Sequence, residues 1–199
     1  RHGTRVHGPI PPSSGVSNYQ VKADNFSSFS SPEFDATPTS SSDTTNSLSD
    51  GKYYWHVRAK DNAGNWSSWS SPRYFTVDDT NPGVPSLLSP SNGSHTTDTT
   101  PTFDWSSASD GTSGIAKYQL IVETDTLGIN KINIETTSSQ YTPSSSEALD
   151  AGGAGYDWRV RAMDNAGNWG SWTSDRRIYI DDPKGTISVT INPASAVDE

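Results

Sequence analysis

The feature that most constrains this chain is a block of 15 residues that occurs twice. The first copy reads Trp55-His-Val-Arg-Ala-Lys-Asp-Asn-Ala-Gly-Asn-Trp-Ser-Ser-Trp69, and the second reads Trp158-Arg-Val-Arg-Ala-Met-Asp-Asn-Ala-Gly-Asn-Trp-Gly-Ser-Trp172. The copies begin 103 residues apart, which is close to the length of one β-sandwich domain. An enzyme needs only one active site. A block that recurs in consecutive domains therefore predicts residues that stabilise the fold rather than residues of an active site.

The repeat divides the 199 residues into two domains of about 100 residues each. We expect a first β-sandwich over 1–79, a second over 80–182 and a C-terminal strand segment over 183–199. Hydrophobic residues form only 30% of the chain, a level that can indicate disorder. The 7 Trp, 8 Tyr and 5 Phe residues favour a folded chain instead, since each large ring buries much area.

The charge of the chain excludes two classes of partner. The 14 Lys and Arg residues stand against 23 Asp and Glu residues, which gives a formal charge of −9. Such a chain repels phosphate backbones and anionic lipids, so we expect no nucleic-acid partner and no membrane insertion. The absence of cysteine carries no information on the redox compartment. The Ser/Thr-rich, Lys-poor composition is typical of secreted prokaryotic modules, and we expect an extracellular or cell-surface location.

Short alternating runs, separated by clusters of Gly, Pro, Ser, Asn and Asp, predict an all-β chain. In the second domain the inward positions are large and apolar, as at Phe103, Trp105 and Trp158. Seven such runs with turns between them predict a sandwich of two sheets. The predicted strands cover 86–88, 102–105, 117–123, 130–135, the position of Tyr141, 156–162 and 177–180.

The first domain is predicted to lack its first strand. Residues 14–19 align with residues 113–118, which places Val6 opposite Trp105. Residues 1–7 then form at most a second strand, and no residues upstream correspond to the first strand of the second domain. We therefore expect an open edge in the first sandwich.

The segment 185–193 is a predicted strand without a sandwich of its own. Its Ile187, Val189 and Ile191 alternate with polar residues and so share one face. Two explanations stay open. Either the chain is a piece of a longer repeat array with a partial domain at each end, or the segment is a donor strand for the first domain of the next copy. Head-to-tail assembly of this kind would remove two aggregation hazards, an open edge and an exposed apolar strand.

The duplicated block, together with Tyr53 and Tyr54 before it, resembles the later strands of fibronectin type III-like and bacterial immunoglobulin-like repeats of extracellular surface proteins. The segments Ser89-Pro-Ser-Asn-Gly-Ser94 and Thr99-Thr-Pro-Thr-Phe-Asp-Trp105 resemble the opening strands of the same repeats. The resemblance covers residues 14–182. It implies two tandem immunoglobulin-like sandwiches, a fold that serves as spacer, adhesin or enzyme appendage.

The segment Trp66-Ser-Ser-Trp-Ser70 also matches the Trp-Ser-x-Trp-Ser signature of class I cytokine receptors, in which strand arginines stack between the tryptophans. The paired cysteines of those receptors are absent here, so the match implies only the cation–π stacking of arginine on tryptophan and not the receptor function. We expect a structural stack on the outer face of each domain, and binding of sugars or peptides by the rings is the alternative. The predicted members are Arg58, Trp66, Trp69 and Arg73 in the first domain and Arg161, Trp169, Trp172 and Arg176 in the second.

The Asp-Asn-Ala-Gly-Asn segments that start at Asp61 and Asp164 have the composition of tight turns. Asp can accept hydrogen bonds from downstream backbone N–H groups, and Gly takes a positive φ without steric cost. The rival hypothesis is calcium, with Asp61 or Asp164 joining the pairs Asp78-Asp79 and Asp181-Asp182 at the domain junction. No dedicated calcium loop is present, so the primary prediction is a chain without a cofactor.

Catalytic patterns are missing from the sequence. The histidines, His2, His7, His56 and His95, have no metal-ligand spacing, and His56 is expected on the outer surface of its strand. The glycine-rich segment 152–155 precedes a strand, whereas phosphate binding needs a helix. We therefore predict neither catalytic residues nor a metal site, and a chain that is not an enzyme.

The predicted function is a non-enzymatic extracellular structural module, either a surface stalk or a filament subunit. Its expected partners are other copies of itself or neighbouring repeats of the same chain. The short linker 78–82 ends in Pro82, which restricts the hinge between the domains. The alternative is an adhesion or carbohydrate- or protein-binding appendage of a larger secreted protein.

Overall fold

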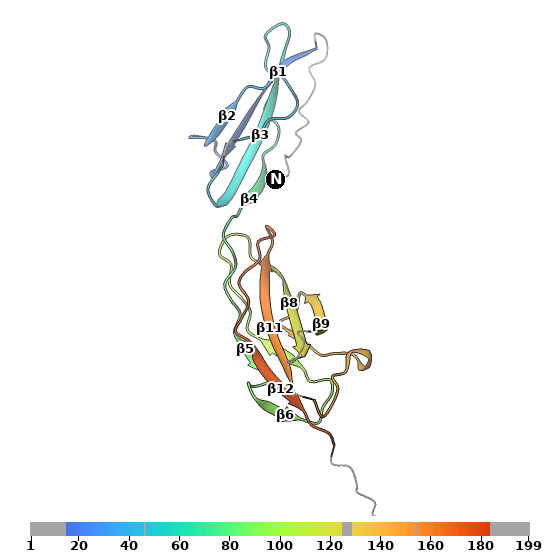
Figure 1. Ribbon diagram of the computed structural model, residues 1–199. Coiled ribbons are helices and arrows are strands. Elements are labelled where there is room, and N and C mark those ends of the chain that lie inside the picture. Colours follow the sequence, from blue (N-terminus) through green and yellow to red (C-terminus); the bar gives the residue numbers. More distant parts are fainter. Residues whose placement is uncertain (1–14, 46, 125–128, 154, 184–199) are drawn as a thin grey trace, which may run out of the picture. The chain divides into compact units, whose positions relative to one another are not determined.

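A computed structural model of the chain describes residues 15–45, 47–124, 129–153 and 155–183 (Figure 1). These residues divide into two compact units. The first unit comprises the described residues up to Val84 together with Ala108–Lys117 and Ala162–Ser171. The second comprises Pro85–Ser107, Tyr118–Arg161 and the described residues from Trp172 onward.

Four strands, which we call the first repeat, form one antiparallel sheet in the order β2-β1-β3-β4. The long strand β3 alternates in burial, with Tyr53, Val57 and Ala59 turned into the interior. The strands are β1 (Val16–Asp24), β2 (Phe34–Ala36), β3 (Gly51–Asp61) and β4 (Arg73–Val77).

Eight strands, which we call the second repeat, form two sheets. One sheet has the order β10-β7-β5, and the other has the order β6-β12-β11-β8-β9 with β6 parallel to β12. The strands are β5 (Leu87–Ser89), β6 (Ser94–Thr96), β7 (Phe103–Trp105), β8 (Ile115–Thr124), β9 (Asn130–Thr136), β10 (Gln140–Tyr141), β11 (Tyr156–Asp164) and β12 (Arg176–Ile180).

Aromatic rings fill the core of the second repeat. Phe103 and Trp158 come from different sheets, and their ring centroids lie 5.2 Å apart in an edge-to-face contact. Trp105 and Tyr118 make a second contact of this kind at 5.7 Å. All four side chains are buried, so the two sheets pack face to face through large rings.

The predicted all-β class is confirmed, and each predicted strand of the second repeat has a counterpart in the structure. The strand β6 and the short 3-10 helix Ser145–Glu147 were not predicted. The strand β6 was missed because its residues, Ser94, His95 and Thr96, show no apolar alternation. Backbone pairing with β12 makes this segment a strand. Among the described residues, no helix is long and apolar enough to cross a membrane.

Other expectations stay predictions. The boundaries 1–79, 80–182 and 183–199 are not tested by the sheets described above. The segment 1–7 and the donor segment with Ile187, Val189 and Ile191 lie outside the described residues.

Candidate functional site

The outer face of the first repeat carries a stack of a cation between two rings. The Arg58 guanidinium lies 4.4 Å from the ring centroid of Trp66 and 4.5 Å from that of Trp69. Its Nε and Nη2 both donate to Oε1 of Gln20 on β1, at 2.9 and 2.7 Å. These bonds fix the plane of the guanidinium, so the cation is held flat against both indoles.

The stack continues beyond Trp69 through His56. The imidazole lies 3.9 Å from the Trp69 ring on one side and 3.6 Å from the Phe29 ring on the other, nearly parallel to both. His56 was expected on the outer surface; it does point outward, but the two rings leave it only 9% exposed. Phe29 adopts a φ of 51°, a left-handed conformation that is uncommon for a residue other than glycine.

The environment of His56 opposes its charged form. Burial lowers the pKa of this imidazole from its ordinary value, the positive charges of Lys22 and Arg58 lower it further, and Asp35 acts in the opposite direction. Nε2 of His56 is buried and has no hydrogen-bond partner among the described residues. A neutral ring therefore fits this position better than an imidazolium.

The second repeat builds a corresponding stack, with an arginine in place of the histidine. The Arg161 guanidinium lies 4.5 Å from the Trp172 ring centroid, and its Nε donates to Oε1 of Gln119 at 2.9 Å. Arg159, which replaces the histidine of the first repeat, lies 5.4 Å from the same ring. The amine of Lys117 lies 5.8 Å from the Trp169 ring.

Two arginines expected in these stacks lie elsewhere. Arg73 pairs with Trp55 across the strands and so shares its sheet face, whereas Arg58 is three positions from Trp55 and faces the other way. The guanidinium of Arg176 donates to the carbonyl oxygens of Leu88 and Pro90, at 3.0 and 3.2 Å. Both arginines are the first residue of a strand and lie on the face opposite the stack. The prediction was wrong because it ignored the alternation of side chains between the two faces of a sheet.

The turn that starts at Asp164 is closed by its own carboxylate. Oδ1 of Asp164 accepts hydrogen bonds from the backbone N–H groups of Ala166, Gly167 and Asn168, at 2.7 to 2.9 Å. Gly167 has a φ of 99°, which favours glycine at this position. Asp164 is fully buried, and the turn that its carboxylate closes forms a platform at the end of β11.

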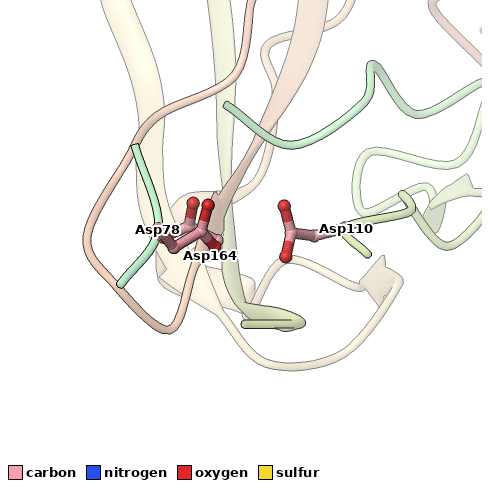
Figure 2. A group of neighbouring side chains, drawn as sticks. All are labelled: Asp78, Asp110 and Asp164. Atoms are coloured by element: carbon pink, nitrogen blue, oxygen red, sulfur yellow. The ribbon is translucent and has the colours of Figure 1, made fainter. Parts of the chain in front are cut away.

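Three carboxylates meet at this platform (Figure 2). Asp78 follows β4, Asp110 precedes β8 and Asp164 ends β11, and all three belong to the first compact unit. One carboxylate oxygen from each lies within 4.8 Å of the others. None of the salt bridges among the described residues joins these three carboxylates to a basic side chain.

Two details bear on the ability of this group to hold a cation. Oδ1 of Asp110 accepts bonds from the N–H groups of Ser113 and Gly114, both at 2.8 Å, and these bonds hold the pKa of Asp110 below its ordinary value. Oδ2 of Asp78 is buried without a hydrogen-bond partner among the described residues. Ionised carboxylates with a free oxygen are the ligands that Ca²⁺ prefers.

The calcium hypothesis named only part of this group. Asp78 and Asp164 are brought together as that hypothesis requires, but Asp61 closes its own turn through Asn65 and Asp181 contacts the imidazole of His95 at 2.9 Å. Asp110 was missed. Its loop has no metal-binding motif, and only the Asp-Gly turn composition there could have drawn attention to it.

The two packed sheets of the second repeat form an immunoglobulin-like sandwich. A family model for the N-terminal immunoglobulin domain of Rha78A-like proteins matches residues 90–180. Exoglucanase B of Cellulomonas fimi is 31% identical over 152 residues, which cover 72% of this chain but 13% of the relative.

Two solved structures show the same fold. One is of the fibronectin(III)-like modules of CbhA from Clostridium thermocellum. The match covers 92% of this chain and 88% of the CbhA chain, with a TM-score of 0.51 and 13% sequence identity. The other is of the FN1–FN3 domains of chicken CNTN1. The match covers 84% of this chain and 57% of the CNTN1 chain, with a TM-score of 0.56 and 15% sequence identity. These similarities show that the chain has a fibronectin type III-like, immunoglobulin-like fold.

The buried imidazole generates a pH prediction. Because the pKa of His56 lies below 6.5 in the folded chain, the unfolded chain binds the proton more readily. The free energy of unfolding of the first repeat should therefore fall as the pH drops below about 6.5. The variant His56→Phe keeps the ring stack and cannot titrate, so it should lose this part of the acid sensitivity in urea titrations between about pH 5 and pH 8.

The variant His95→Phe is the matched control, since it removes an exposed imidazole from the second repeat. It should leave the acid sensitivity of the first repeat unchanged. Equal pH profiles for the wild type and His56→Phe would contradict the assignment.

Proposed function

We propose that the chain is a non-catalytic extracellular structural module that acts as a stiff spacer within a larger secreted protein. The observation that carries this proposal is the bonding of the segment that follows β4. The N–H of Asp79 donates to Asp50 Oδ1 at 2.8 Å, and the hydroxyl of Thr80 donates to the other oxygen of the same carboxylate at 2.5 Å. Asn168 Nδ2 donates to the carbonyl oxygen of Asp78 at 3.0 Å.

The segment is fixed at its far end as well. The N–H of Gly83 donates to the carbonyl oxygen of Ser109 at 2.8 Å, and Pro82 has a restricted φ. A connection that is hydrogen-bonded at several points has few conformations and bends little, whereas a flexible linker samples many directions. These bonds support a spacer in preference to a tether.

Two similar proteins support an extracellular location for this spacer, within a larger enzyme. The match to Exoglucanase B covers most of this chain and 13% of that relative, as expected for a module attached to a larger enzyme. The fibronectin(III)-like modules of CbhA have the same fold. We therefore propose that the chain lies outside the cell, as a non-catalytic part of a larger protein similar to Exoglucanase B.

One observation favours a binding appendage as the second candidate. Tyr54 and Tyr74 form an aromatic pair outside the stacks, with ring centroids 6.5 Å apart, and Tyr74 is 65% exposed. Exposed ring pairs can bind sugars. The amine of Lys52, however, lies 4.1 Å from the Tyr74 centroid and 5.1 Å from that of Tyr54, so this cation competes for the ring faces. The spacer is the better supported function.

The three carboxylates add a second element to the spacer proposal. A Ca²⁺ ion held by Asp78, Asp110 and Asp164 would link the bonded segment to the loops beside it. Ca²⁺ takes 6–8 oxygen ligands, so backbone carbonyls or water would complete the shell. The buried free oxygen of Asp78 supports this role, because a bound cation would satisfy it.

The spacer proposal predicts a narrow distribution of distances across the segment. Spin labels on cysteines introduced at the exposed residues Ser28 and Ser138 should give one narrow peak, since the chain has no other cysteine. The variant Asp50→Ala removes two bonds to the segment and should broaden this peak, whereas Asp43→Ala should not. A wild-type distribution as broad as that of Asp50→Ala would overturn the stiff spacer.

The calcium element has its own test. The melting temperature should rise when Ca²⁺ is added to chelator-treated chain, because a ligand that binds only the folded state stabilises it by about 2.7 kcal/mol at 100 times its Kd. Asp110→Asn should reduce this rise. Asp98→Asn is the matched control, because Asp98 accepts a similar turn bond from Thr100 but lies outside the carboxylate group. Identical melting curves with Ca²⁺ and with chelator would show that no such site exists.

A further inference from the structure

One outward-facing position of the sheet differs in chemistry between the two repeats. In the first repeat Tyr54 of β3 pairs with Tyr74 of β4, and in the second Asp157 of β11 pairs with Arg177 of β12. Each residue lies 103 positions from its counterpart, as in the duplicated block. The two pairs therefore occupy the same place in the same scaffold.

The second repeat fills this place with an ion pair. Nε and Nη2 of Arg177 donate to the two carboxylate oxygens of Asp157, at 2.9 and 2.7 Å. This two-point bond joins neighbouring strands and presents no aromatic surface to solvent. The scaffold therefore needs no ring at this position.

The first repeat places exposed rings there instead. The ring centroids of Tyr54 and Tyr74 lie 6.5 Å apart, and Tyr74 is 65% exposed. The amine of Lys52, whose counterpart is Gly155, lies 4.1 Å from the Tyr74 centroid. A ring that stays mostly in water contributes little to a core. Two rings and a cation that replace an ion pair and a glycine at one spot indicate a surface that binds something.

The charges on this face differ in sign from those of the chain as a whole, whose formal charge is −9. The cations at strand positions of the face are Lys22, Lys52, Arg58 and Lys60. The carboxylates at its strand positions are both engaged. Asp24 is fully buried and accepts bonds from two loop N–H groups, and Asp35 pairs with Lys22. Within the described part of the chain, Lys22 alone among the four cations has a carboxylate partner.

The class of ligand follows from the rings and the cation together. A sugar ring has an apolar C–H face that packs on tyrosine, and a carboxylate carried by the same sugar pairs with lysine. A neutral sugar has to displace the Lys52 amine from the ring faces, whereas a carboxylated sugar keeps it as a partner. Double-stranded nucleic acid fits poorly, because its charges lie about 1.7 Å apart along the axis and the rest of this acidic chain repels them.

We propose that the outer face of the first repeat binds an acidic polysaccharide at Tyr54, Tyr74 and Lys52. The sugar ring packs on Tyr74, and its carboxylate pairs with the Lys52 amine. This site assigns a class of ligand to the binding appendage, the second candidate function. It does not require the module to be stiff.

The charge is tested with polygalacturonate as the probe and its fully methyl-esterified form as the neutral polymer. The wild-type chain should bind polygalacturonate in isothermal titration calorimetry at about 50 mM salt, where charges are weakly screened, and should not bind the ester. Lys52→Gln should weaken the binding about fivefold, the effect of one exposed charge pair. Lys131→Gln is the matched control, since it removes an exposed lysine of the second repeat, and it should leave the affinity unchanged.

The rings are tested by giving the first repeat the ion pair of the second. The double variant Tyr54→Asp/Tyr74→Arg keeps a cross-strand pair and leaves the formal charge of the chain unchanged. Its affinity for polygalacturonate should fall at least about tenfold, because the stacking surface is lost. Circular dichroism checks that the variant is folded. If it is not, Tyr74→Gln, a change at an exposed side chain, should give a loss of affinity in the same direction.

Three results would overturn the site: no binding of polygalacturonate, equal binding of the methyl ester, or equal affinity of the wild type and the folded ring variant. Polyglutamate, which carries carboxylates without sugar rings, tests an acidic protein as the partner. Binding of polyglutamate as tight as that of polygalacturonate would overturn the polysaccharide ligand. The spin-label distances are measured without polymer, so failure of the spacer and failure of the binding site are distinguished.

Discussion

The structure depends on the side-chain parity of two long strands, β3 and β11. Each turns a tryptophan to one face and, three residues later, an arginine to the other. Trp158 enters the core against Phe103, while Arg161 lies on the outer face against Trp172. One strand therefore sets the register of the core and of the outer stack together. A slip of one residue would exchange both faces, so the duplicated block specifies the fold more strongly than its polar composition suggests.

Much of the fold could be predicted because large residues at alternating positions mark inward faces, as at Trp105 and Trp158. The strand β6 could not, because its three polar residues become a strand only through β12. The same limit applies to the carboxylate group. Asp164 lies in a readable turn, but the approach of Asp110 depends on how two loops pack, which leaves no local pattern. The cover of His56 by Phe29 is likewise a long-range contact.

The differences between the repeats carry more functional information than the shared block. The histidine sandwiched in the first repeat is an arginine in the second, where it pairs with Glu123 at 2.8 Å. Among the described residues β4 is the last strand of its sheet, whereas in the second repeat β6 pairs with the equivalent strand β12. In the described part of the chain, a common scaffold thus carries a stack with a titratable imidazole and a group of acidic loops. These features suit a module that connects and aligns larger parts of a protein.

The central claim is that the duplicated block stabilises the scaffold through its stacks. A double-mutant cycle with Arg58→Met and Trp66→Leu tests it most directly, because the cycle isolates the energy of one pair. We predict a favourable coupling of about 0.5–2 kcal/mol in the free energy of unfolding, measured by urea titration. The pair Arg73 and Trp66 should show none, since Arg73 lies on the opposite face. Purely additive losses for Arg58 and Trp66 would contradict the claim.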